Sequence, residues 1–478
     1  MKRIVWRFSL LILVLIFGLA SSGGCAGFLS SCVPDKNPPI VLITSPPNEA
    51  YVKGTVPIQV TATDNVGISK VVFYIDGVKV GVGTSAPYIY NWDTYGLHDG
   101  TTHTIYAEAY DYADNIGTSQ VITVTIGTSW TFMVYMNGDN SLSSETTYDL
   151  QEMESVGSTN GVNIIVQLDT YGNNGCWRYM VRQGSLDLLA QLPELDSGSP
   201  STLTDFANWA MQNYPAKYYA LIIWDHGNGW RRTTITRGIS QDVTSNSIIS
   251  SAGLKQAINQ MSNRINLLGM DACLMSTIEV AYQVKGNVDY MVGSEESEPI
   301  KGWPYDTILS ALADNPYITP RDLASTIVDR YVSSYSSTEG VTQSALDLSG
   351  IDPLVSSCNT LAQTLIDNMN SYKSNIQNAI SNTQKYSGDP NQYDLYDFAY
   401  HLLGINSSIY TAALNVMNNV GSVVVNERHS SGGGVGNSHG ISVWIPNSTD
   451  YSNSISTYST LDFAINTSWT QFLQSLLF

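Results

Sequence analysis

The chain has 478 residues and carries 22 lysines and arginines against 41 aspartates and glutamates, a formal net charge of −19. A surface this acidic repels phosphate backbones, so nucleic acid is not expected as a partner. Hydrophobic residues make up 43% of the chain and 29 residues are tyrosines, which excludes a disordered acidic tail. The length suffices for about three domains.

The N-terminus has the pattern of a secretory signal. Lys2 and Arg3 precede a short apolar run, residues 8–20, and small residues follow it. The run is shorter than the about 20 apolar residues that a transmembrane helix needs. We therefore expect residues 1–31 to be a signal peptide and the mature protein to be exported.

Residues 29–32, Leu-Ser-Ser-Cys, resemble a bacterial lipobox, in which the cysteine receives a lipid and becomes the new N-terminus. This predicts a lipoprotein of the cell envelope or cell surface, attached to the membrane through Cys32. Cys25 is the alternative lipidation site, and ordinary cleavage with free secretion is the alternative to lipidation. The three cysteines further along the chain are an odd number, so at least one thiol stays unpaired.

Residues 32–39 form a short proline-containing tether, and short alternating β-segments separated by turns fill residues 40–127. Six or seven strands in under about 100 residues predict an all-β sandwich. The sequence segments at 43–46, 64–67 and 73–77 resemble those of the bacterial immunoglobulin-like modules found in many exported enzymes. The expected strands are residues 40–43, 58–63, 70–75, 78–82, 104–110 and 120–126.

A repeated Asp-Asn pair in this region could be part of a turn or of a metal site. Asp64-Asn65 recurs as Asp114-Asn115, and each pair is followed by an apolar residue and a glycine. We interpret both pairs as turns, since Asp and Asn favour turns by bonding to their own backbone. A calcium site is the alternative.

From residue 128 to 478 the pattern changes to continuous apolar runs that alternate with amphipathic stretches. This alternation predicts an α/β domain with a mostly parallel sheet covered by helices on both faces. The expected strands are residues 131–136, 163–168, 219–224, 265–270, 290–292, 422–426 and 440–445. The expected helices are residues 144–156, 202–213, 251–261, 274–284, 320–335, 353–382 and 461–477.

Two of the expected strands end in reactive residues. Strand 219–224 is followed by His226 and Gly227, and strand 265–270 is followed by Asp271 and Cys273. Ligands of open α/β sheets bind at the carboxyl ends of the strands, so these residues are expected at one groove. A thiol becomes a strong nucleophile when an imidazole accepts its proton. The backbone N–H groups of Gly227 and Cys273 are candidates for stabilising an oxyanion.

Each of these residues also has an ordinary structural interpretation. A lone cysteine at a strand end is usually a small buried hydrophobe, and a histidine in a glycine-rich turn is often structural. His226 and Cys273 nevertheless have the order and rough spacing of caspase-type peptidases. Cys176 and Cys358 are the fallback nucleophiles, and neither has a histidine placed by a neighbouring strand.

The region from about residue 130 to 478 resembles the clostripain-type cysteine peptidases of the caspase and gingipain clan. The matching segments are residues 133–140, 165–169, 225–227, 271–275, 294–296 with 302–303, and 440–446.

The resemblance implies a caspase-like fold and a catalytic dyad of His226 and Cys273. It also implies cleavage after Arg or Lys, with Asp271 binding that side chain, a role that suits a carboxylate. A helix N-cap is the alternative for Asp271. Family members often cut themselves after a basic residue between His and Cys, which points to Arg237 or a neighbouring arginine. The nearby acidic residues Glu295, Glu296, Glu298 and Asp306 are expected at the surface, and added negative potential at the site is the alternative.

No His-Glu-x-x-His or paired Cys-x-x-Cys motif occurs in the chain. Residues 436–440, Gly-Asn-Ser-His-Gly, match the Gly-x-Ser-x-Gly pattern, but an expected strand follows them rather than the helix of a nucleophile elbow. We therefore expect neither a catalytic zinc nor a serine hydrolase, and the dyad needs no cofactor, although the sequence leaves bound Ca²⁺ open. The prediction is an exported endopeptidase acting on proteins or peptides that contain Arg or Lys. The alternative is a cell-surface binding or adhesion protein whose peptidase-like domain no longer cleaves.

Overall fold

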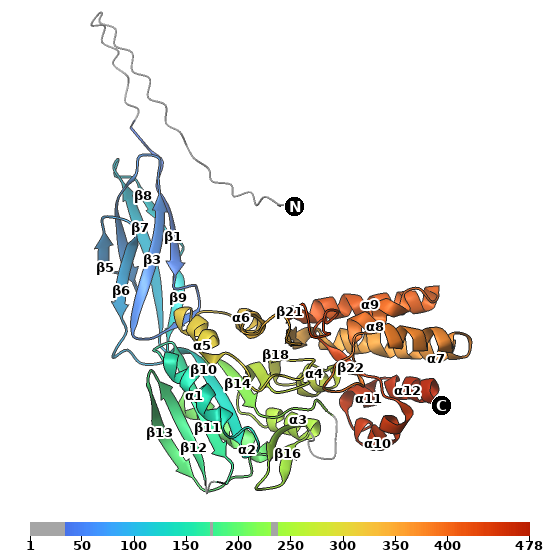
Figure 1. Ribbon diagram of the computed structural model, residues 1–478. Helices are drawn as coiled ribbons and strands as arrows, with labels where there is room; N and C mark the ends of the chain where they lie inside the picture. Colours follow the sequence, from blue (N-terminus) through green and yellow to red (C-terminus); the bar gives the residue numbers. More distant parts are fainter. Residues whose placement is uncertain (1–33, 173–174, 231–237) are drawn as a thin grey trace, which may run out of the picture.

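The computed structural model describes residues 34–172, 175–230 and 238–478. An all-β part and a larger α/β part follow one another along the chain (Figure 1). The signal peptide, Cys25 and Cys32, and the arginines at 231, 232 and 237 lie outside the described residues. Within the described ranges, no helix combines the length and the apolar character needed to cross a membrane.

The all-β part is a sandwich of two sheets. Strand β3 (Thr55–Thr63) lies between β1 (Ile40–Ser45) and β6 (Tyr88–Asp93) in one sheet. The other sheet has the order β2-β9-β7-β4-β5, with β8 paired to β7. These strands are β2 (Ala50–Val52), β4 (Ile68–Ile75), β5 (Val78–Gly83), β7 (Thr102–Asp111), β8 (Ile116–Thr118) and β9 (Ile122–Ile126).

All six strands expected in this part are present, and the two Asp-Asn pairs lie in the connections between strands, as predicted. Strands β2, β6 and β8 were not predicted. Strands β2 and β8 have three residues each, which is too short for an alternating pattern to be recognised. The core between the sheets includes Val71, Ile105 and Val124, each 0% exposed.

The two parts meet without a linker, because only Gly127 separates β9 from β10 (Thr128–Gly138). The Gly127 N–H donates to the Val52 carbonyl at 2.9 Å, and Ser129 Oγ donates to the Tyr51 carbonyl at 2.9 Å. Tyr317 of the α/β part packs against the core of the sandwich. The last strand of the sandwich therefore runs directly into the large sheet.

The α/β part contains a nine-stranded mixed sheet of order β13-β12-β11-β10-β14-β17-β18-β19-β21. Strands β11, β10, β14, β17 and β18 are parallel, as predicted, and the strands at both edges are antiparallel. The strands are β11 (Val162–Thr170), β12 (Cys176–Arg182), β13 (Ser185–Leu192), β14 (Ala216–Trp224), β17 (Ile265–Asp271), β18 (Val288–Gly293), β19 (Thr342–Asp347) and β21 (Val424–His429).

Helices cover both faces of this sheet, as the sequence predicts. Successive residues of β10 point to opposite faces, so Met133 and Tyr135 join one core while Phe132 and Val134 join the other. Helices α1 (Glu145–Val156), α5 (Tyr305–Asp314) and α6 (Pro320–Ser333) cover one face. Helices α2 (Pro200–Asn213), α3 (Ser251–Asn259), α4 (Ile278–Val284) and α7 (Ile351–Asn382) cover the other.

Four expected elements differ from the structure. The strand expected at 440–445 spans only β22 (Ser442–Trp444), which pairs with β20 (Gln392–Asp394) outside the large sheet. The helix expected at 274–284 begins at Ile278, and residues 422–423 belong to α9 rather than to a strand. The helix expected at 461–477 is broken into α11 and α12, where Thr467 is extended with φ −133° and ψ 163°. The remaining elements are β15 (Ile239–Asp242), β16 (Ser247–Ile249), β20 (Gln392–Asp394), β22 (Ser442–Trp444), α8 (Leu395–Leu402), α9 (Ser407–Val423), α10 (Ser448–Tyr458), α11 (Asp462–Asn466) and α12 (Trp469–Leu477).

Candidate active site

His226 and Cys273 lie beyond the carboxyl ends of the neighbouring parallel strands β14 and β17. The Asp225 N–H donates to the Asp271 carbonyl at 3.3 Å, which continues the pairing past the end of β14. A Cβ atom on Gly227 would lie 2.5 Å from the Cys273 carbonyl oxygen, so only glycine permits this approach. The backbone next to His226 is therefore in direct contact with the backbone of Cys273.

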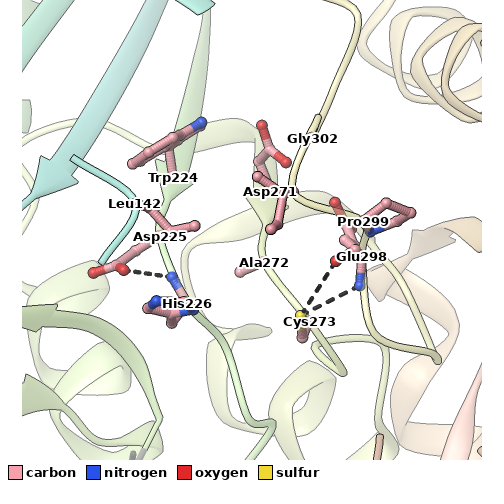
Figure 2. A pocket seen from close by; sticks show the side chains of 11 residues that line it. Leu142, Trp224, Asp225, His226, Asp271, Ala272, Cys273, Glu298, Pro299 and Gly302 are labelled. Atoms are coloured by element: carbon pink, nitrogen blue, oxygen red, sulfur yellow. Dashed lines mark hydrogen bonds between the residues drawn. The ribbon is translucent and has the colours of Figure 1, made fainter. Parts of the chain in front are cut away.

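Both residues line a pocket of about 240 Å³ at this edge of the sheet. Figure 2 shows His226 and Cys273 on either side of Ala272, with Asp271 and Glu298 nearby. Leu142, Trp224, Pro299 and Ile300 supply apolar wall. The pocket thus combines a thiol, an imidazole and carboxylates in one concave site, which is where a substrate is expected.

The loop after β10 holds the histidine. Ser141 Oγ lies 2.8 Å from His226 Nε2. The His226 N–H donates to the carboxylate of Asp225, which also accepts a hydrogen bond from Asn140 Nδ2 at 2.7 Å. Burial lowers the pKa of His226, so its imidazole is neutral at neutral pH and can accept a proton.

The thiol of Cys273 is in contact with the backbone of Glu298. The Glu298 N–H donates to Cys273 Sγ at 3.3 Å, and Sγ lies 3.8 Å from the Glu298 carbonyl oxygen. Burial raises the pKa of the Cys273 thiol. Leu274, the next residue, has φ +63°, an uncommon conformation for a residue with a side chain. Such backbone outliers often occur at functional sites.

The two fallback nucleophiles do not face a substrate. Cys176 and Cys358 are each 0% exposed, whereas Cys273 is partly exposed in the pocket. Burial raises the pKa of Cys176 to about 12 and also raises that of Cys358. Both behave as small core hydrophobes, the ordinary role of a buried cysteine.

Asp271 ends β17 and points into the pocket as an acceptor. Its Oδ2 accepts hydrogen bonds from the Tyr305 hydroxyl at 2.9 Å and from the Trp303 N–H at 3.3 Å. The N-cap alternative for Asp271 is wrong, because α4 begins several residues later and Thr277 caps it. Burial raises the pKa of Asp271 to about 6, so it is ionised at neutral pH.

Glu298 places a second carboxyl group beside Asp271. Its Oε2 is buried, and the pKa of Glu298 is raised well above its usual value by burial and by the charge of Asp271. At neutral pH the two acids therefore carry about one negative charge between them. No Lys, Arg or His in the described ranges forms an ion pair with either carboxylate.

The expectation that the nearby acidic residues lie at the surface is wrong for Glu295 and Glu296, which are 1% and 4% exposed. Glu295 accepts a hydrogen bond from the Gly440 N–H, and Glu296 accepts one from the Gly388 N–H at 2.8 Å. Both carboxylates therefore hold loops in place around the site. Asp306 is half-buried.

Sequence reasoning missed Ser141 and the role of Glu298, and it did not single out Gly302 as part of the pocket. A Cβ on Gly302, which has φ +63°, would lie 3.1 Å from Asp271 Oδ1. Ser141 and Gly302 are small residues in loops, with no pattern around them that indicates a contact to a distant side chain. The sequence shows that Glu298 is one of several acidic residues close together in the chain, but it does not show that its carboxyl group is buried.

The family comparisons agree with this fold. A model of the clostripain family matches residues 134–476, and a model of a bacterial Ig domain matches residues 39–107. Clostripain from Hathewaya histolytica is 26% identical over 219 residues, which cover 38% of this chain and 42% of clostripain. The match thus spans less than half the length of that relative.

Two solved structures share the fold. One is a secreted C11 cysteine protease from Bacteroides thetaiotaomicron in complex with an irreversible peptide inhibitor. It is 23% identical to this chain with a TM-score of 0.55, and the match covers 70% of this chain and 99% of that protease. An inactive zymogen C11 protease from Parabacteroides distasonis is 22% identical with a TM-score of 0.58, covering 71% and 98%. The predicted fold class is therefore confirmed. Since the family model covers well over half of the chain, this protein is a cysteine peptidase of the clostripain family.

Proposed function

We propose that this protein is an exported cysteine endopeptidase that hydrolyses peptide bonds after Arg or Lys through a dyad of His226 and Cys273. The observation that carries the proposal is the pocket in which the partly exposed thiol, a neutral imidazole and a buried, ionised carboxylate lie together. Protein or peptide substrates fit a surface that is net negative, because cationic side chains are attracted to it.

The pKa directions indicate the protonation states before reaction. The thiol has a raised pKa and the imidazole a lowered one, so both groups are neutral at neutral pH. His226 then accepts the thiol proton as Cys273 Sγ attacks the carbonyl carbon. Transfer of that proton to the leaving amine breaks the C–N bond and leaves a thioester, which water hydrolyses. The N–H groups of Gly227 and Cys273 would stabilise the oxyanion.

The preference for Arg or Lys rests on Asp271 and Glu298. A guanidinium or ammonium group entering the pocket would pair with Asp271 and compensate its buried charge. The apolar wall formed by Leu142 and Ile300 suits the methylene stem of either side chain. One carboxylate serves both cations, so the proposal covers Arg and Lys together.

Turnover of fluorogenic peptides tests the proposal. Peptides ending in Arg, Lys, Ala or Asp before the reporter are compared between the wild type, Cys273→Ala and the surface control Ser144→Ala. We expect cleavage of the Arg and Lys peptides by the wild type and by Ser144→Ala only. Activity that survives in Cys273→Ala would overturn the dyad. No cleavage by any variant, even after processing, would favour the surface-binding protein with an inactive peptidase-like domain.

We also propose self-processing at Arg237 or a neighbouring arginine, which lie outside the described residues. The solved zymogen of a related protease supports the idea that some C11 proteases need activation. The wild type, Cys273→Ala and Arg237→Ala proteins are purified side by side and examined by denaturing gel and mass spectrometry. Cleavage in the wild type alone supports the proposal, and one intact band for all three, or cleavage of Cys273→Ala, contradicts it.

The organisation that we propose is a signal peptide at 1–31, a tether at 32–39, a sandwich at 40–127 and a peptidase domain at 128–478. The secreted Bacteroides protease supports export of the chain. Attachment through a lipid on Cys32 is tested by expressing the wild type, Cys32→Ser and Cys25→Ser in a bacterial host and fractionating membranes. Loss of membrane association in Cys32→Ser alone is expected, and loss in Cys25→Ser alone would move the lipid to Cys25.

A further inference from the structure

Three buried carboxyl groups lie at the pocket or next to its wall. Asp271 and Glu298 line the pocket, whereas Asp149 of α1 does not. Asp149 is instead bound to the wall residue Trp224, whose Nε1 donates to Asp149 Oδ2 at 2.6 Å. Asp149 is 1% exposed and Asp271 is 5% exposed. Among the ion pairs of the described ranges, none joins a Lys, Arg or His to any of these three acids.

The carboxyl groups of Glu298 and Asp271 are hydrogen-bonded to each other. An ionised carboxylate only accepts hydrogen bonds, so a bond between two carboxyl groups requires a proton on one of them. The donors favour the negative charge on Asp271, whose Oδ2 accepts from the Tyr305 hydroxyl and the Trp303 N–H. Glu298 Oε1 is offered only a long hydrogen bond, 3.4 Å from Gln343 Nε2. The shared proton therefore belongs to Glu298.

The other titratable side chains around the pair add no positive charge. They are Asp149 and Glu152 of α1, Cys273, Tyr305 of α5, and Tyr331 and Tyr335 of α6. Burial and the charge of Asp271 raise the pKa of Asp149 to about 9, so Asp149 keeps its proton at neutral pH. Burial also raises the pKa of the thiol and of the three tyrosines, which are therefore neutral. Lys301 lies over the Tyr335 ring, 5.9 Å from its centroid.

We propose that the pocket exchanges a proton for the cation of the substrate. Before the substrate binds, Glu298 holds its proton against Asp271. When an Arg or Lys side chain enters, Glu298 gives this proton to the solvent, and both carboxylates bind the cation. One proton thus leaves for each cation that enters. The inference rests on the proposed preference for Arg or Lys.

The exchange follows from what buried acids and buried cations each require. A positive charge at hydrogen-bonding distance favours the ionised form of a carboxyl group, and the entering cation brings that charge to Glu298. A guanidinium has five N–H donors and an ammonium has three, and all of them need acceptors once water is removed. Loss of the Glu298 proton supplies further acceptors. An uncharged side chain cannot displace the proton, because two adjacent buried carboxylates would then repel each other without a countercharge.

Calorimetry with a probe that cannot be cleaved tests the exchange in the wild type, after any self-processing. Butylguanidine carries the cation of arginine on a short carbon chain, and butylurea is its uncharged counterpart. Each is titrated at pH 7.5 in phosphate and in Tris, and the change in observed enthalpy with the ionisation enthalpy of the buffer gives the number of protons released. We expect butylguanidine to release about one proton on binding and butylurea to release none.

Two variants identify the source of the proton. Glu298→Gln keeps a donor to Asp271 but has no proton to lose, so it should bind butylguanidine without proton release. Asp149→Asn is the matched control, a second protonated acid next to the pocket. It should release as many protons as the wild type, because Asp149 does not line the pocket.

The pH dependence of the wild type provides a second measurement, which decides if Glu298→Gln does not fold. Between pH 7 and 8.5 a guanidinium does not titrate. Asp271, whose pKa is about 6, is already ionised there, and His226, whose pKa is lowered by burial, is neutral. The affinity for butylguanidine should nevertheless rise several-fold across this window, because fewer protons compete for Glu298. Asp149→Asn should keep this rise.

The outcomes separate this inference from the proposed function. Butylguanidine binding that Asp271→Asn abolishes, but that releases no proton from the wild type, would overturn the exchange and leave the preference for Arg or Lys in place. Proton release that Asp149→Asn removes and Glu298→Gln keeps would also overturn it. Loss of turnover for every Arg and Lys peptide in the wild type would instead mark the failure of the proposed function, and the exchange would fall with it.

Discussion

Trp224 and Asp271 are register partners on the parallel strands β14 and β17, and His226 and Cys273 each follow two residues after them. Because parallel strands leave a sheet at the same edge, equal offsets from a register pair place both reactive residues at the same level. A slip of one strand by one residue would reverse which face each side chain points to. The apolar cores on both faces of the sheet therefore also determine that His226 and Cys273 emerge at the same edge of the sheet.

Alkylation should distinguish the three described cysteines. Iodoacetamide at neutral pH is expected to modify Cys273 first, because Cys176 and Cys358 are fully buried. Peptide mass spectrometry over a time course measures the order of modification. Unfolding the protein in denaturant should abolish the difference, and faster modification of Cys176 in the native protein would contradict the assignment of the nucleophile.

Ser141→Ala tests whether the loop after β10 orients the histidine. Loss of the 2.8 Å contact to His226 Nε2 is expected to lower kcat by roughly 10- to 100-fold, because misplacement of a catalytic group is costly. KM should change little, since Ser141 does not line the pocket. Ser144→Ala, at an exposed position nearby, is the matched control, and an equal loss in both variants would refute the positioning role.

The pKa of Asp271, about 6, predicts a pH dependence of substrate binding. As the pH falls through 6, Asp271 becomes protonated and loses its attraction for a cationic side chain, so kcat/KM for an Arg peptide should fall. Asp271→Asn should lower that kcat/KM by on the order of 100-fold or more at pH 7.5, the scale of a buried ion pair that loses one partner. Asp306→Asn, half-buried in the neighbouring helix, should leave it nearly unchanged.

Hydrolysis of an uncharged peptide shows whether Asp271→Asn changes specificity or causes a general loss of function. If Asp271→Asn lowers the weak hydrolysis of an Ala peptide as strongly as that of an Arg peptide, Asp271 supports the fold of the site rather than its specificity.

Glu279 predicts a pH dependence of stability. This glutamate is fully buried beneath β22, where it accepts hydrogen bonds from the Trp444 N–H and the Tyr458 hydroxyl, and burial raises its pKa to about 7. The folded protein keeps a proton here that the unfolded chain releases above about pH 4.5. Stability is therefore lost as the pH rises from about 4.5 to 7, by on the order of 3 kcal/mol.

Glu279→Gln removes this ionisation, so the variant should gain in free energy of unfolding relative to the wild type across that window and show no further change above it. Chemical denaturation at several pH values measures the difference. Glu339→Gln is a control for which the pH dependence of the free energy of unfolding should have the opposite sign. The Ser336 N–H donates to this exposed glutamate and lowers its pKa. A difference for Glu279→Gln that does not vary with pH would contradict the prediction.

The central strands and the positions of His226 and Cys273 could be predicted because buried parallel strands are continuous apolar runs. Such runs in β14 and β17 are followed at once by polar residues, so their ends are visible in the sequence. The antiparallel edge strand β13 was missed because its side chains are mostly exposed or half-buried, which leaves no continuous apolar pattern.

The surroundings of His226 and Cys273 could not be predicted to the same depth. Ser141 and Glu298 reach the site from loops, and what places them is tertiary packing rather than a local period. Glu298 in particular is separated from Cys273 by 25 positions and meets it through a backbone hydrogen bond. Any residue type can make such a contact, so the side chains in the sequence carry no signal for it.

The junction at Gly127 has a mechanical consequence. Strand β9 continues into β10, the strand whose end carries the loop that holds His226, and hydrogen bonds such as Gly127 N–H to Val52 tie the two parts together. A force on the N-terminal sandwich would act on a strand in the interior of a nine-stranded sheet, where neighbouring strands on both sides resist it. The sandwich and the sheet are therefore stiffly coupled, and a force on the sandwich would reach the strand that carries the loop around His226.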